Sequence, residues 1–481
     1  MTTVAPTQAL VQSREPFTGR VVFEAPVTPP DEVPRVVERA RVAQRDWSRR
    51  SHTDRLAVAQ RFADLARERL PQLAQRITEE TGKPRWESTG EAKLIPAKVD
   101  AMVKAHDTRL AANPILVGTA TGQTAYRPLG VVAVLGPFNF PAHLPNGQIV
   151  PALLAGNAVV FKPSEFTPGT ADLLATCWAD AGLPRDVLQV IHGDHNTGQA
   201  LVDAHINALF FTGSDTAGRA IHRALAGRPD VLLALEMGGN NPIVAHRVDD
   251  PQRAAELIAV SAFVTAGQRC TCARRLIFTD DTEADRILET LLELTRSLRV
   301  GPPEVKPEPF MGPVIHAAAA QRVLDAQAQW ISRGAKPLLE ARPLHGRTAL
   351  LSPGILDTTS VPHDPEYDDA EIFGPLLRVI RTRSLQDTIE EANRTRFGLA
   401  ASLLSDDPEA FGIFQRDAHA GLLNHNLPTT GASGLLPFGG LGDSGNHRPM
   451  GFHAVDHCVT PVAVVDASEM QPTNMPLRLS P

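Results

Sequence analysis

The chain has few cysteines and no long apolar run. Its 481 residues include four cysteines, too few for a disulfide scaffold, and no second Cys/His cluster stands near Cys270 and Cys272 to complete a zinc site. No apolar run reaches membrane-spanning length, and the N-terminus lacks the basic-then-apolar pattern of a signal peptide. We therefore expect reduced thiols, no metal, no membrane partner and a cytoplasmic location.

Basic patches are missing as well. The formal net charge is -7, and no basic stripe provides a nucleic-acid footprint. An anionic small-molecule substrate stays possible, because electrostatic steering is local. The strand-to-helix run at residues 211–218 has neither the G-x-G-x-x-G spacing of a dinucleotide fingerprint nor a Walker A sequence, and fixed-period repeats are absent. A hydrophobic content of 43% and a charged content of 21% suit a globular protein of two or three domains.

Alternating strand and helix patterns occupy most of the chain. The first sixteen residues are polar and unpatterned, which predicts a loose arm. Helical periodicity begins near Asp31, Thr53 is a candidate cap for a second helix, and Gly82 is a candidate stop. Five short apolar runs then alternate with helical stretches, and they begin at Val131, Asn157, Val187, Ala208 and Val231. This spacing predicts βαβ units and a parallel sheet.

Further along, a second alternating region runs from about residue 240 to 430. A hairpin is expected between Leu116 and Pro128, with its turn at Thr121-Gly122-Gln123-Thr124. Near the C-terminus, residues 437–445 form a long glycine-rich loop.

Cys270 and Glu236 are the strongest candidates for chemistry. Cys270 lies in Gly267-Gln268-Arg269-Cys270-Thr271-Cys272, and Glu236 lies in Leu235-Glu236-Met237-Gly238-Gly239-Asn240. They offer a thiol nucleophile and a candidate base, and the neighbouring glycines allow close approach by backbone or ligand. Taken alone, Cys270 fits equally well as a small buried apolar residue.

Three polar residues follow the first two predicted strands. Asn139 ends the first strand, and its amide could donate to a developing oxyanion. Lys162 and Glu165 end the second, where strand carboxyl ends line the ligand crevice of a doubly wound sheet. A carboxylate there can accept from ribose hydroxyls. Alone, Asn139 is also an ordinary turn residue, and Lys162 and Glu165 are equally well solvated turn charges.

The run from Phe211 to Gly218 follows a strand and opens a predicted helix. Free N–H groups and the helix dipole at such a terminus bind anions. The candidate cofactor-binding residues here are Gly213, Ser214, Asp215, Thr216, Ala217 and Gly218. A helix cap without a ligand would show the same pattern.

Seven motifs together resemble one family. GPFNFP, KPSE, FTGS, LEMGGNNP, GQRCTCA, EIFGP and PFGG follow one another in the order found in the aldehyde dehydrogenase superfamily. The similarity covers about residues 16–465. It implies an α/β chain with the aldehyde dehydrogenase fold, which combines an open parallel-sheet cofactor domain, an α/β catalytic domain and a small β oligomerisation element.

The resemblance also implies domain boundaries and an assembly. Residues 1–111 and 128–236 are the expected NAD-binding domain, and residues 237–436 the catalytic domain. Residues 112–127 and 452–481 are the expected bridging element, through which a homo-oligomer would form.

The activity implied by the resemblance is NAD-dependent oxidation of an aldehyde. Cys270 is the expected nucleophile, Asn139 the oxyanion donor and Glu236 the base for hydrolysis of the thioester. Glu371 is expected to hold the nicotinamide ribose, with Phe373 against that end of the cofactor. A CoA-acylating enzyme, or a binding protein that has lost activity, is an alternative, but a CoA-dependent relative need not retain Glu236.

A closer resemblance, within the superfamily, implies the substrate. Residues 143–147, 262–275 and 444–449 match members that oxidise N-succinylglutamate semialdehyde, which carries two carboxylates. The match departs at His425 and Leu427, where Trp and Lys are expected, so another small anionic or aliphatic semialdehyde is the alternative. Arg448 is the first candidate for binding a substrate carboxylate, with His143 and His425 behind it.

Overall fold

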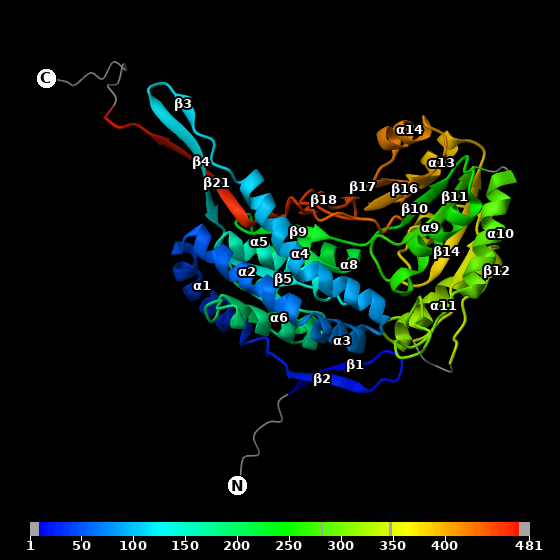
Figure 1. The fold of residues 1–481 in the computed structure, drawn as a ribbon, viewed down its shortest axis with the longest axis horizontal. Coiled ribbons are helices and arrows are strands. Elements are labelled where there is room, and N and C mark those ends of the chain that lie inside the picture. The colour runs from blue at the N-terminus through cyan, green and yellow to red at the C-terminus, as the bar shows by residue number, and fades with distance from the viewer. Residues whose placement is uncertain (1–8, 280–281, 346–348, 471–481) are drawn as a thin grey trace, which may run out of the picture.

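Two parallel sheets form the two halves of the chain, and a small antiparallel sheet projects from the first half. The computed structural model describes residues 9–279, 282–345 and 349–470. Figure 1 shows the N-terminal half, in blue to green, beside the half that follows it, in green to orange. Within the described residues, no helix is both long and apolar enough to cross a membrane.

The first sheet has five parallel strands, which are the five apolar runs expected from the sequence. In spatial order they are β7 (Leu188–Val190), β6 (Ala158–Lys162), β5 (Val131–Leu135), β8 (Ala208–Thr212) and β9 (Leu232–Glu236). Alternate residues of β5 face two separate cores, with Val132 and Val134 in one and Val131 and Ala133 in the other. Burial on both faces explains why these strands are continuously apolar. The chain order reverses between β5 and β8, where open α/β sheets bind ligands.

The helices of this half pack on both faces of the sheet. They are α1 (Val33–Arg49), α2 (His52–Glu68), α3 (Leu70–Thr81), α4 (Arg85–Arg109), α5 (His143–Leu154), α6 (Pro168–Asp180), α7 (His195–Asp203) and α8 (Asp215–Leu225). Gly82, with φ +71, is a helix stop as predicted, but it ends α3, because the predicted second helix is divided at Arg69 into α2 and α3. Thr53 was the wrong cap for α2, because Ser51 and Asp54 form a reciprocal capping box two residues earlier and leave Thr53 inside the first turn.

The second sheet has seven strands. Their spatial order is β12 (Lys336–Leu339), β13 (Gly354–Asp357), β14 (Leu376–Thr382), β11 (Ala273–Thr279), β10 (Asn241–Ala245), β16 (Ala400–Leu404) and β17 (Leu422–His425). All neighbours are parallel except β12, which runs antiparallel to β13. Its helical segments are α9 (Pro251–Phe263), η1 (Val264–Gly267), α10 (Thr282–Ser297), α11 (Ala317–Ser332), α12 (Pro365–Asp368), α13 (Leu385–Ala392) and α14 (Ala410–Asp417).

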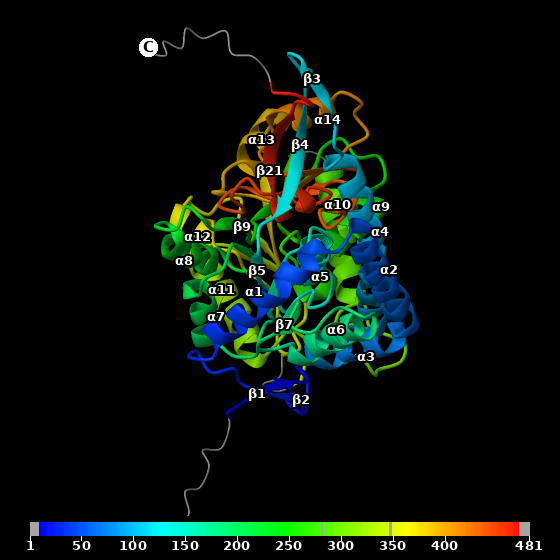
Figure 2. The ribbon, with the colours of Figure 1, turned by 90° about the vertical axis from the view of Figure 1, so that its left-hand side faces the viewer.

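A three-stranded antiparallel sheet projects from the body. It joins β3 (Ile115–Val117), β4 (Ala120–Pro128) and β21 (Val459–Asp466), and both views show it extending away from the two main sheets (Figures 1 and 2). The hairpin is confirmed, but its predicted turn is wrong. Gly118, with φ +62, and Thr119 make the turn, whereas Thr121–Thr124 lies within β4. A Cβ on Gly122 would lie 2.6 Å from Val117 Cγ2, so this glycine admits a cross-strand side chain.

The remaining elements are short. β1 (Leu10–Arg14) pairs with β2 (Val21–Pro26), so the expected loose arm is wrong for residues 10–14, while residues 1–8 lie outside the described part. The glycine-rich loop near the C-terminus holds β18 (Pro437–Phe438) and β19 (Leu441–Gly442). After the loop, β20 (Met450–Gly451) pairs with β18, and β19 pairs with β15 (Phe397–Gly398). The short η2 (Ala454–Cys458) leads into β21. Residues 471–481 of the expected bridging element are also outside the described part.

Candidate active site

Two cavities meet at the three predicted catalytic residues. The larger cavity, of about 930 Å³, follows the carboxyl ends of β5, β6, β8 and β9 and reaches across to the second half of the chain. The smaller cavity, of about 170 Å³, lies against α4 and α5. Asn139, Glu236 and Cys270 line both. This arrangement allows one ligand on each side of the thiol.

Most of the predicted cofactor residues line the larger cavity. Lys162, Glu165, Gly213, Ser214, Asp215, Thr216, Ala217, Glu371 and Phe373 are among its lining residues. Gly218 lies outside this lining. A Cβ at that position would be 2.3 Å from the sulfur of Met237, so Gly218 allows α8 to pack closely on the chain after β9.

A strained backbone presents the Cys270 thiol. Thr265, Ala266 and Gly267 have φ values of 58°, 53° and 70°, a left-handed run that costs free energy in the non-glycine residues. At Gly267, a Cβ would lie 2.1 Å from the carbonyl oxygen of Gly374, so no larger residue fits. Strain of this kind persists only where surrounding contacts hold it in place.

Two side chains hold this loop, and the sequence reasoning assigned neither of them. Arg274 donates from Nη1 to the Gly267 carbonyl at 2.6 Å and from Nη2 to the Arg269 carbonyl at 3.0 Å. Asn241 donates from Nδ2 to the carbonyls of Cys270 at 2.6 Å and Cys272 at 2.9 Å. Both lie within or beside the quoted motifs, which were the available signal.

Burial disfavours the charged form of both Cys270 and Glu236. Burial, followed by the nearby carboxyls of Glu371 and Glu236, raises the pKa of the Cys270 thiol to about 12. Burial also raises the pKa of Glu236 well above its usual value, although a backbone hydrogen bond from Met450 partly opposes this. Glu236 Oε2 is buried without a hydrogen-bond partner. An unpaired carboxyl group with a raised pKa is a strong proton acceptor once it ionises.

Glycines make room for the two glutamates. A Cβ on Gly439 would lie 3.0 Å from Glu236 Oε1, and one on Gly238 would lie 1.8 Å from Glu371 Oε2. The Gly239 N–H donates to Glu371 at 3.2 Å. Burial raises the pKa of Glu371 to about 7, against the opposing charge of Arg274. The glycines of the LEMGG and PFGG motifs therefore admit carboxylates in this site.

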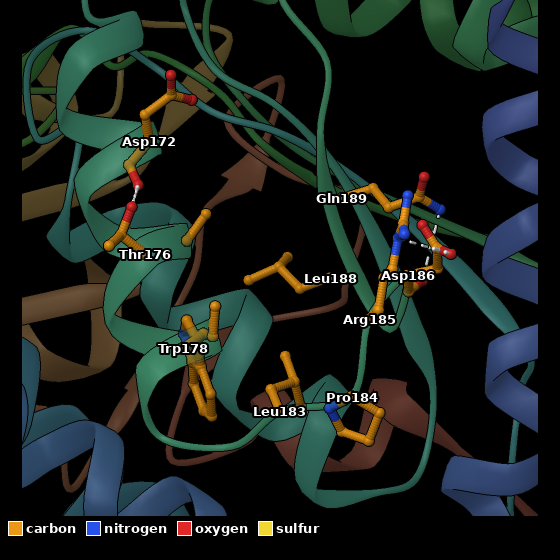
Figure 3. A pocket seen from close by; sticks show the side chains of 11 residues that line it. Asp172, Thr176, Trp178, Leu183, Pro184, Arg185, Asp186, Leu188 and Gln189 are labelled. Atoms are coloured by element: carbon orange, nitrogen blue, oxygen red, sulfur yellow. Dashed lines mark hydrogen bonds and ion pairs between the residues drawn. The ribbon is translucent and has the colours of Figure 1, made fainter.

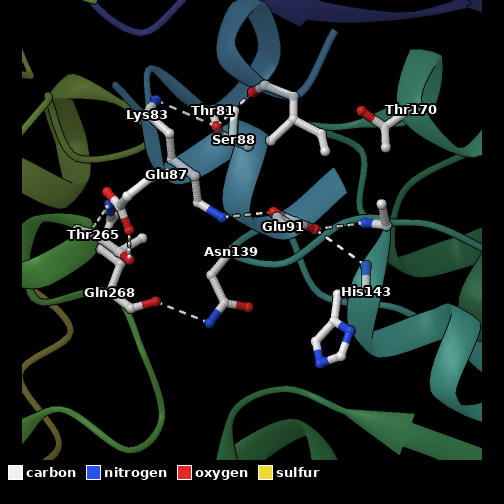
Figure 4. Close-up of polar contacts among 12 residues, drawn as sticks. Thr81, Lys83, Glu87, Ser88, Glu91, Asn139, His143, Thr170, Thr265 and Gln268 are labelled. Carbon is white, nitrogen blue, oxygen red and sulfur yellow. Dashed lines mark hydrogen bonds and ion pairs between the residues drawn. The ribbon is translucent and has the colours of Figure 1, made fainter. Parts of the chain in front are cut away.

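Asn139 is held beside the loop of residues 265–270 that carries Cys270, here named the thiol loop. Its Nδ2 donates to the Gln268 carbonyl at 2.8 Å, and the residue is 5% exposed (Figure 4). An amide carries two N–H donors, so this bond fixes the orientation and leaves the other donor for a ligand. The geometry is compatible with the predicted oxyanion role.

A polar wall behind the site was not foreseen from the sequence. Lys83 Nζ lies 2.8 Å from Glu91 Oε2, and Glu91 Oε1 accepts from the N–H groups of Ala142 and His143 at the start of α5. Figure 4 shows Glu91 between the lysine and these two N–H groups. A carboxylate at a helix N-terminus satisfies otherwise free N–H groups and the helix dipole. The pair therefore anchors the helix that carries His143.

Glu87 extends this wall to the thiol loop. It accepts hydrogen bonds from Thr265 and from Arg269 Nη2, the latter at 2.9 Å. Arg269 in turn donates from Nε to Thr265 Oγ1 at 2.8 Å. The only sequence signal for Glu87 and Glu91 was two acidic residues on a helix, which is typical of a solvated face.

The residues proposed to bind a substrate carboxylate separate in the structure. His143 lines the smaller cavity, as do Lys98 and Arg269, which were not proposed. Arg448 is exposed, lines neither cavity, and donates to the adjacent His447 carbonyl at 3.3 Å. His425 stacks on Phe411 with ring centroids 4.5 Å apart, and also lies outside both linings.

A separate hollow lies on the surface by α6. It has a volume of about 540 Å³ and is lined by residues of α6 and of the segment from Leu183 to Gln189 (Figure 3). None of its lining residues is a predicted site residue. The predicted catalytic residues line the two connected cavities instead.

Known proteins are similar to this chain over nearly its whole length. The model of the aldehyde dehydrogenase family matches residues 3–464. The chain is 47% identical to N-succinylglutamate 5-semialdehyde dehydrogenase of Paraburkholderia xenovorans (strain LB400), over 98% of this chain and 95% of the relative. It is also 47% identical to N-succinylglutamate 5-semialdehyde dehydrogenase 1 of Caulobacter vibrioides, over 98% of each.

Solved structures show the same fold. The NAD-dependent aldehyde dehydrogenase of Sinorhizobium meliloti is 28% identical, with a TM-score of 0.91 over 97% of this chain and 93% of that one. Lactaldehyde dehydrogenase of Escherichia coli is 26% identical, with a TM-score of 0.90 over 96% of both chains. The family match, the full-length relatives and the shared fold lead to one conclusion: this chain belongs to the aldehyde dehydrogenase family.

Proposed function

We propose that this enzyme oxidises N-succinylglutamate 5-semialdehyde to N-succinylglutamate with NAD as the oxidant. The observation that carries the proposal is the meeting of two cavities at Cys270, Glu236 and Asn139. The full-length relatives that carry this substrate in their names support the choice of aldehyde.

Cys270 is the proposed nucleophile. Its thiol loses a proton and the sulfur bonds to the aldehyde carbon, because the thiolate and not the thiol attacks. Asn139 is the proposed donor to the oxygen that becomes negative, and it sits in a buried position where a fixed donor is worth most. The raised pKa of Cys270 means that attack requires a partner that accepts the proton or stabilises the thiolate.

Glu236 is the proposed base for the second half of the reaction. After oxidation the acyl group remains on sulfur as a thioester, and water must be deprotonated to release the acid. Glu236 is buried, unpartnered at Oε2 and shared by both cavities, as a water-activating group requires. Its presence favours hydrolysis over transfer to CoA.

The larger cavity fits a dinucleotide. It opens at the switch point of the first sheet and at the N-terminus of α8, where Ser214 caps the helix. Lys162 ends β6 and Glu165 follows it, and both line the cavity. These two residues are the proposed partners of the ribose hydroxyls, and Glu371 and Phe373 would hold the nicotinamide end. When bound, the oxidised nicotinamide supplies the hydride acceptor for the oxidation. The negative charge of Glu165 opposes a 2′-phosphate, so NAD should be preferred over NADP.

The domains and the assembly are part of the same proposal. The boundaries are 1–111 with 128–236 for the cofactor, 237–436 for catalysis, and 112–127 with 452–481 for bridging. Exposed apolar side chains support an oligomer built through the projecting sheet, since Ile115 is 63% exposed and Leu116 80%. Four free cysteines, including the proposed nucleophile, suit a reducing compartment such as the cytoplasm.

One experiment tests the activity. Purified enzyme is assayed for NADH formation with N-succinylglutamate 5-semialdehyde, succinic semialdehyde and butanal, with NAD or NADP, and with or without CoA. We expect the highest kcat/KM for N-succinylglutamate 5-semialdehyde with NAD and no dependence on CoA. A higher kcat/KM for another aldehyde would replace the substrate, and no NADH with any aldehyde would indicate a protein that has kept the fold without the activity.

A further inference from the structure

Lys98 is a buried lysine whose charge is not paired. It lies on α4, is 9% exposed and lines the smaller cavity together with Cys270 and Glu236. In the described part of the chain, its ammonium group has no hydrogen-bond or ion-pair partner. Burying an ammonium group without a partner is costly, so such groups are rare unless they serve a ligand.

The ammonium group lies where two glycines leave space. A Cβ built on Gly147 of α5 would be 3.6 Å from Lys98 Nζ, and one on Gly434 would be 3.8 Å from it. Gly147 stands one helical turn after His143, which also lines the smaller cavity. The missing side chains keep Nζ in contact with the cavity instead of covering it.

No acidic side chain offsets the charge of Lys98. Burial alone lowers the pKa of Lys98 to about 8. Glu236 is the one carboxylic acid among the residues that line the smaller cavity, and the lowered pKa of Lys98 shows no contribution from it. The ammonium group therefore faces the cavity as an unmatched positive charge.

The other basic groups near Lys98 are either paired with an acid or neutral. Lys83 is paired with Glu91 at 2.8 Å, and Arg269 with Glu87 at 2.9 Å. Burial, followed by the charges of Lys98, Lys83 and Arg269, lowers the pKa of His143 to about 3, so this ring is neutral. The potential in this part of the cavity is positive, and Lys98 supplies its unpaired charge.

We propose that Lys98 binds a carboxylate of the aldehyde substrate, and so selects aldehydes that carry a negative charge away from the reacting carbon. This proposal rests on the proposed function, since it assigns a residue to the substrate of that same site. A carboxylate beside Nζ recovers the cost of burying the ammonium group and forms a charge-assisted hydrogen bond. An aldehyde without a carboxylate does not offset the free-energy cost of burying the ammonium group.

The test compares substrates across variants of one helix. Lys98→Met removes the charge and keeps an unbranched side chain, while Lys104→Met removes an exposed lysine from the same helix as a matched control. We expect Lys98→Met to lower kcat/KM for N-succinylglutamate 5-semialdehyde by about ten- to one-hundredfold, the range of a hydrogen bond to a charged group. With butanal the loss should be about threefold or less, and Lys104→Met should behave like wild type with both aldehydes.

Two further measurements separate binding from structure. Removing an unpaired buried charge should leave the melting temperature unchanged or raised in Lys98→Met. Lys98→Gln provides a second uncharged variant, and it should show the same selectivity if Lys98→Met is poorly folded. An equal loss with both aldehydes, or unchanged selectivity in a folded variant, would overturn the assignment.

The assays distinguish a wrong assignment of Lys98 from a wrong substrate for the enzyme. If wild type does not oxidise N-succinylglutamate 5-semialdehyde, the proposed function is wrong, and the same comparison is made with succinic semialdehyde, which carries one carboxylate. A Lys98→Met loss confined to that charged aldehyde supports the role of Lys98. Equal losses with succinic semialdehyde and butanal contradict it.

Discussion

The smaller cavity has an acidic region and a basic region. The acidic groups of Cys270 and Glu236 are buried where it meets the larger cavity, and the basic groups of Lys98 and His143 are buried along α4 and α5. Burial raises the pKa of Cys270 to about 12 and raises that of Glu236 well above its usual value. Burial lowers the pKa of Lys98 to about 8 and that of His143 to about 3. The same desolvation acts on both regions, and it opposes charge in each.

The difference lies in what each region needs from a ligand. In the acidic region, the proposed reaction forms an anion on the sulfur of Cys270 and then on the oxygen of the aldehyde. The carboxyl group of Glu236 is the proposed proton acceptor there. The basic region keeps one cation without a partner, although Lys83 and Arg269 nearby are fully paired. Paired charges here hold helices and loops, whereas unpaired ones mark where the substrate completes the site.

The largest expected effect comes from the nucleophile. Cys270→Ser should lower kcat by at least about 10³-fold, because an alcohol is a far weaker nucleophile at neutral pH. Cofactor binding, followed by NADH fluorescence titration, should be retained. Cys272→Ser is the neighbouring control and should be mild, and the reverse ranking of the two variants would assign the thiol chemistry to Cys272.

The next effect separates the two half-reactions. Glu236→Gln should slow steady-state turnover by about 10²-fold, since an amide cannot act as the base. A pre-steady-state burst of NADH should survive, because oxidation precedes hydrolysis of the thioester. If the burst slows as much as turnover does, Glu236 acts before the thioester forms.

A pH profile sharpens the contrast between the two regions. Lys98 is charged below its pKa of about 8, so its attraction for a carboxylate is lost as the pH rises through that value. The ratio of kcat/KM for the charged aldehyde to kcat/KM for butanal should fall by about five- to tenfold from pH 7 to pH 9. Cys270 and Glu236 act on both aldehydes and cancel in the ratio.

The other basic groups that line the smaller cavity are His143 and Arg269. The pKa of His143 is lowered to about 3, so this ring is already neutral, and Arg269 is paired with Glu87. The ratio should therefore be flat with pH in Lys98→Met. A fall of the same size in that variant would place the titrating group elsewhere.

The smallest expected effect concerns Arg448. Because it is exposed and bonded only to its own loop, Arg448→Met should change kcat/KM for the charged aldehyde by less than about twofold. The measurement is the same aldehyde pair, with Lys98→Met alongside. A selective loss of tenfold or more in Arg448→Met would move the carboxylate site to the C-terminal loop.

The sequence alone was sufficient to predict the fold, and it proposed the reacting groups that the structure brings to one place. Parallel strands that are buried on both faces are apolar throughout. The apolar runs that begin at Val131 therefore predicted the strands of the first sheet from the local sequence. Cys270, Glu236 and Asn139 stand in short motifs whose residue types are tied to acyl chemistry. Some errors came from local competition, as at Thr53, where Ser51 caps first, and at Gly122, which serves packing within a strand. Arg448 was a different error, because only the tertiary structure shows that it lines neither cavity.

The tertiary structure decided which charges are paired and which are free. In the sequence, Lys83, Lys98 and Lys104 are three lysines in one helical region, and each resembles a solvated side chain. Packing against α5 buries Lys83 beside Glu91, buries Lys98 beside the glycine at 147, and leaves Lys104 in solvent. Glu91 is only eight residues from Lys83, but α5 and Gly147 are distant in the sequence from both buried lysines. No local pattern could therefore predict the free energy of burying each charge.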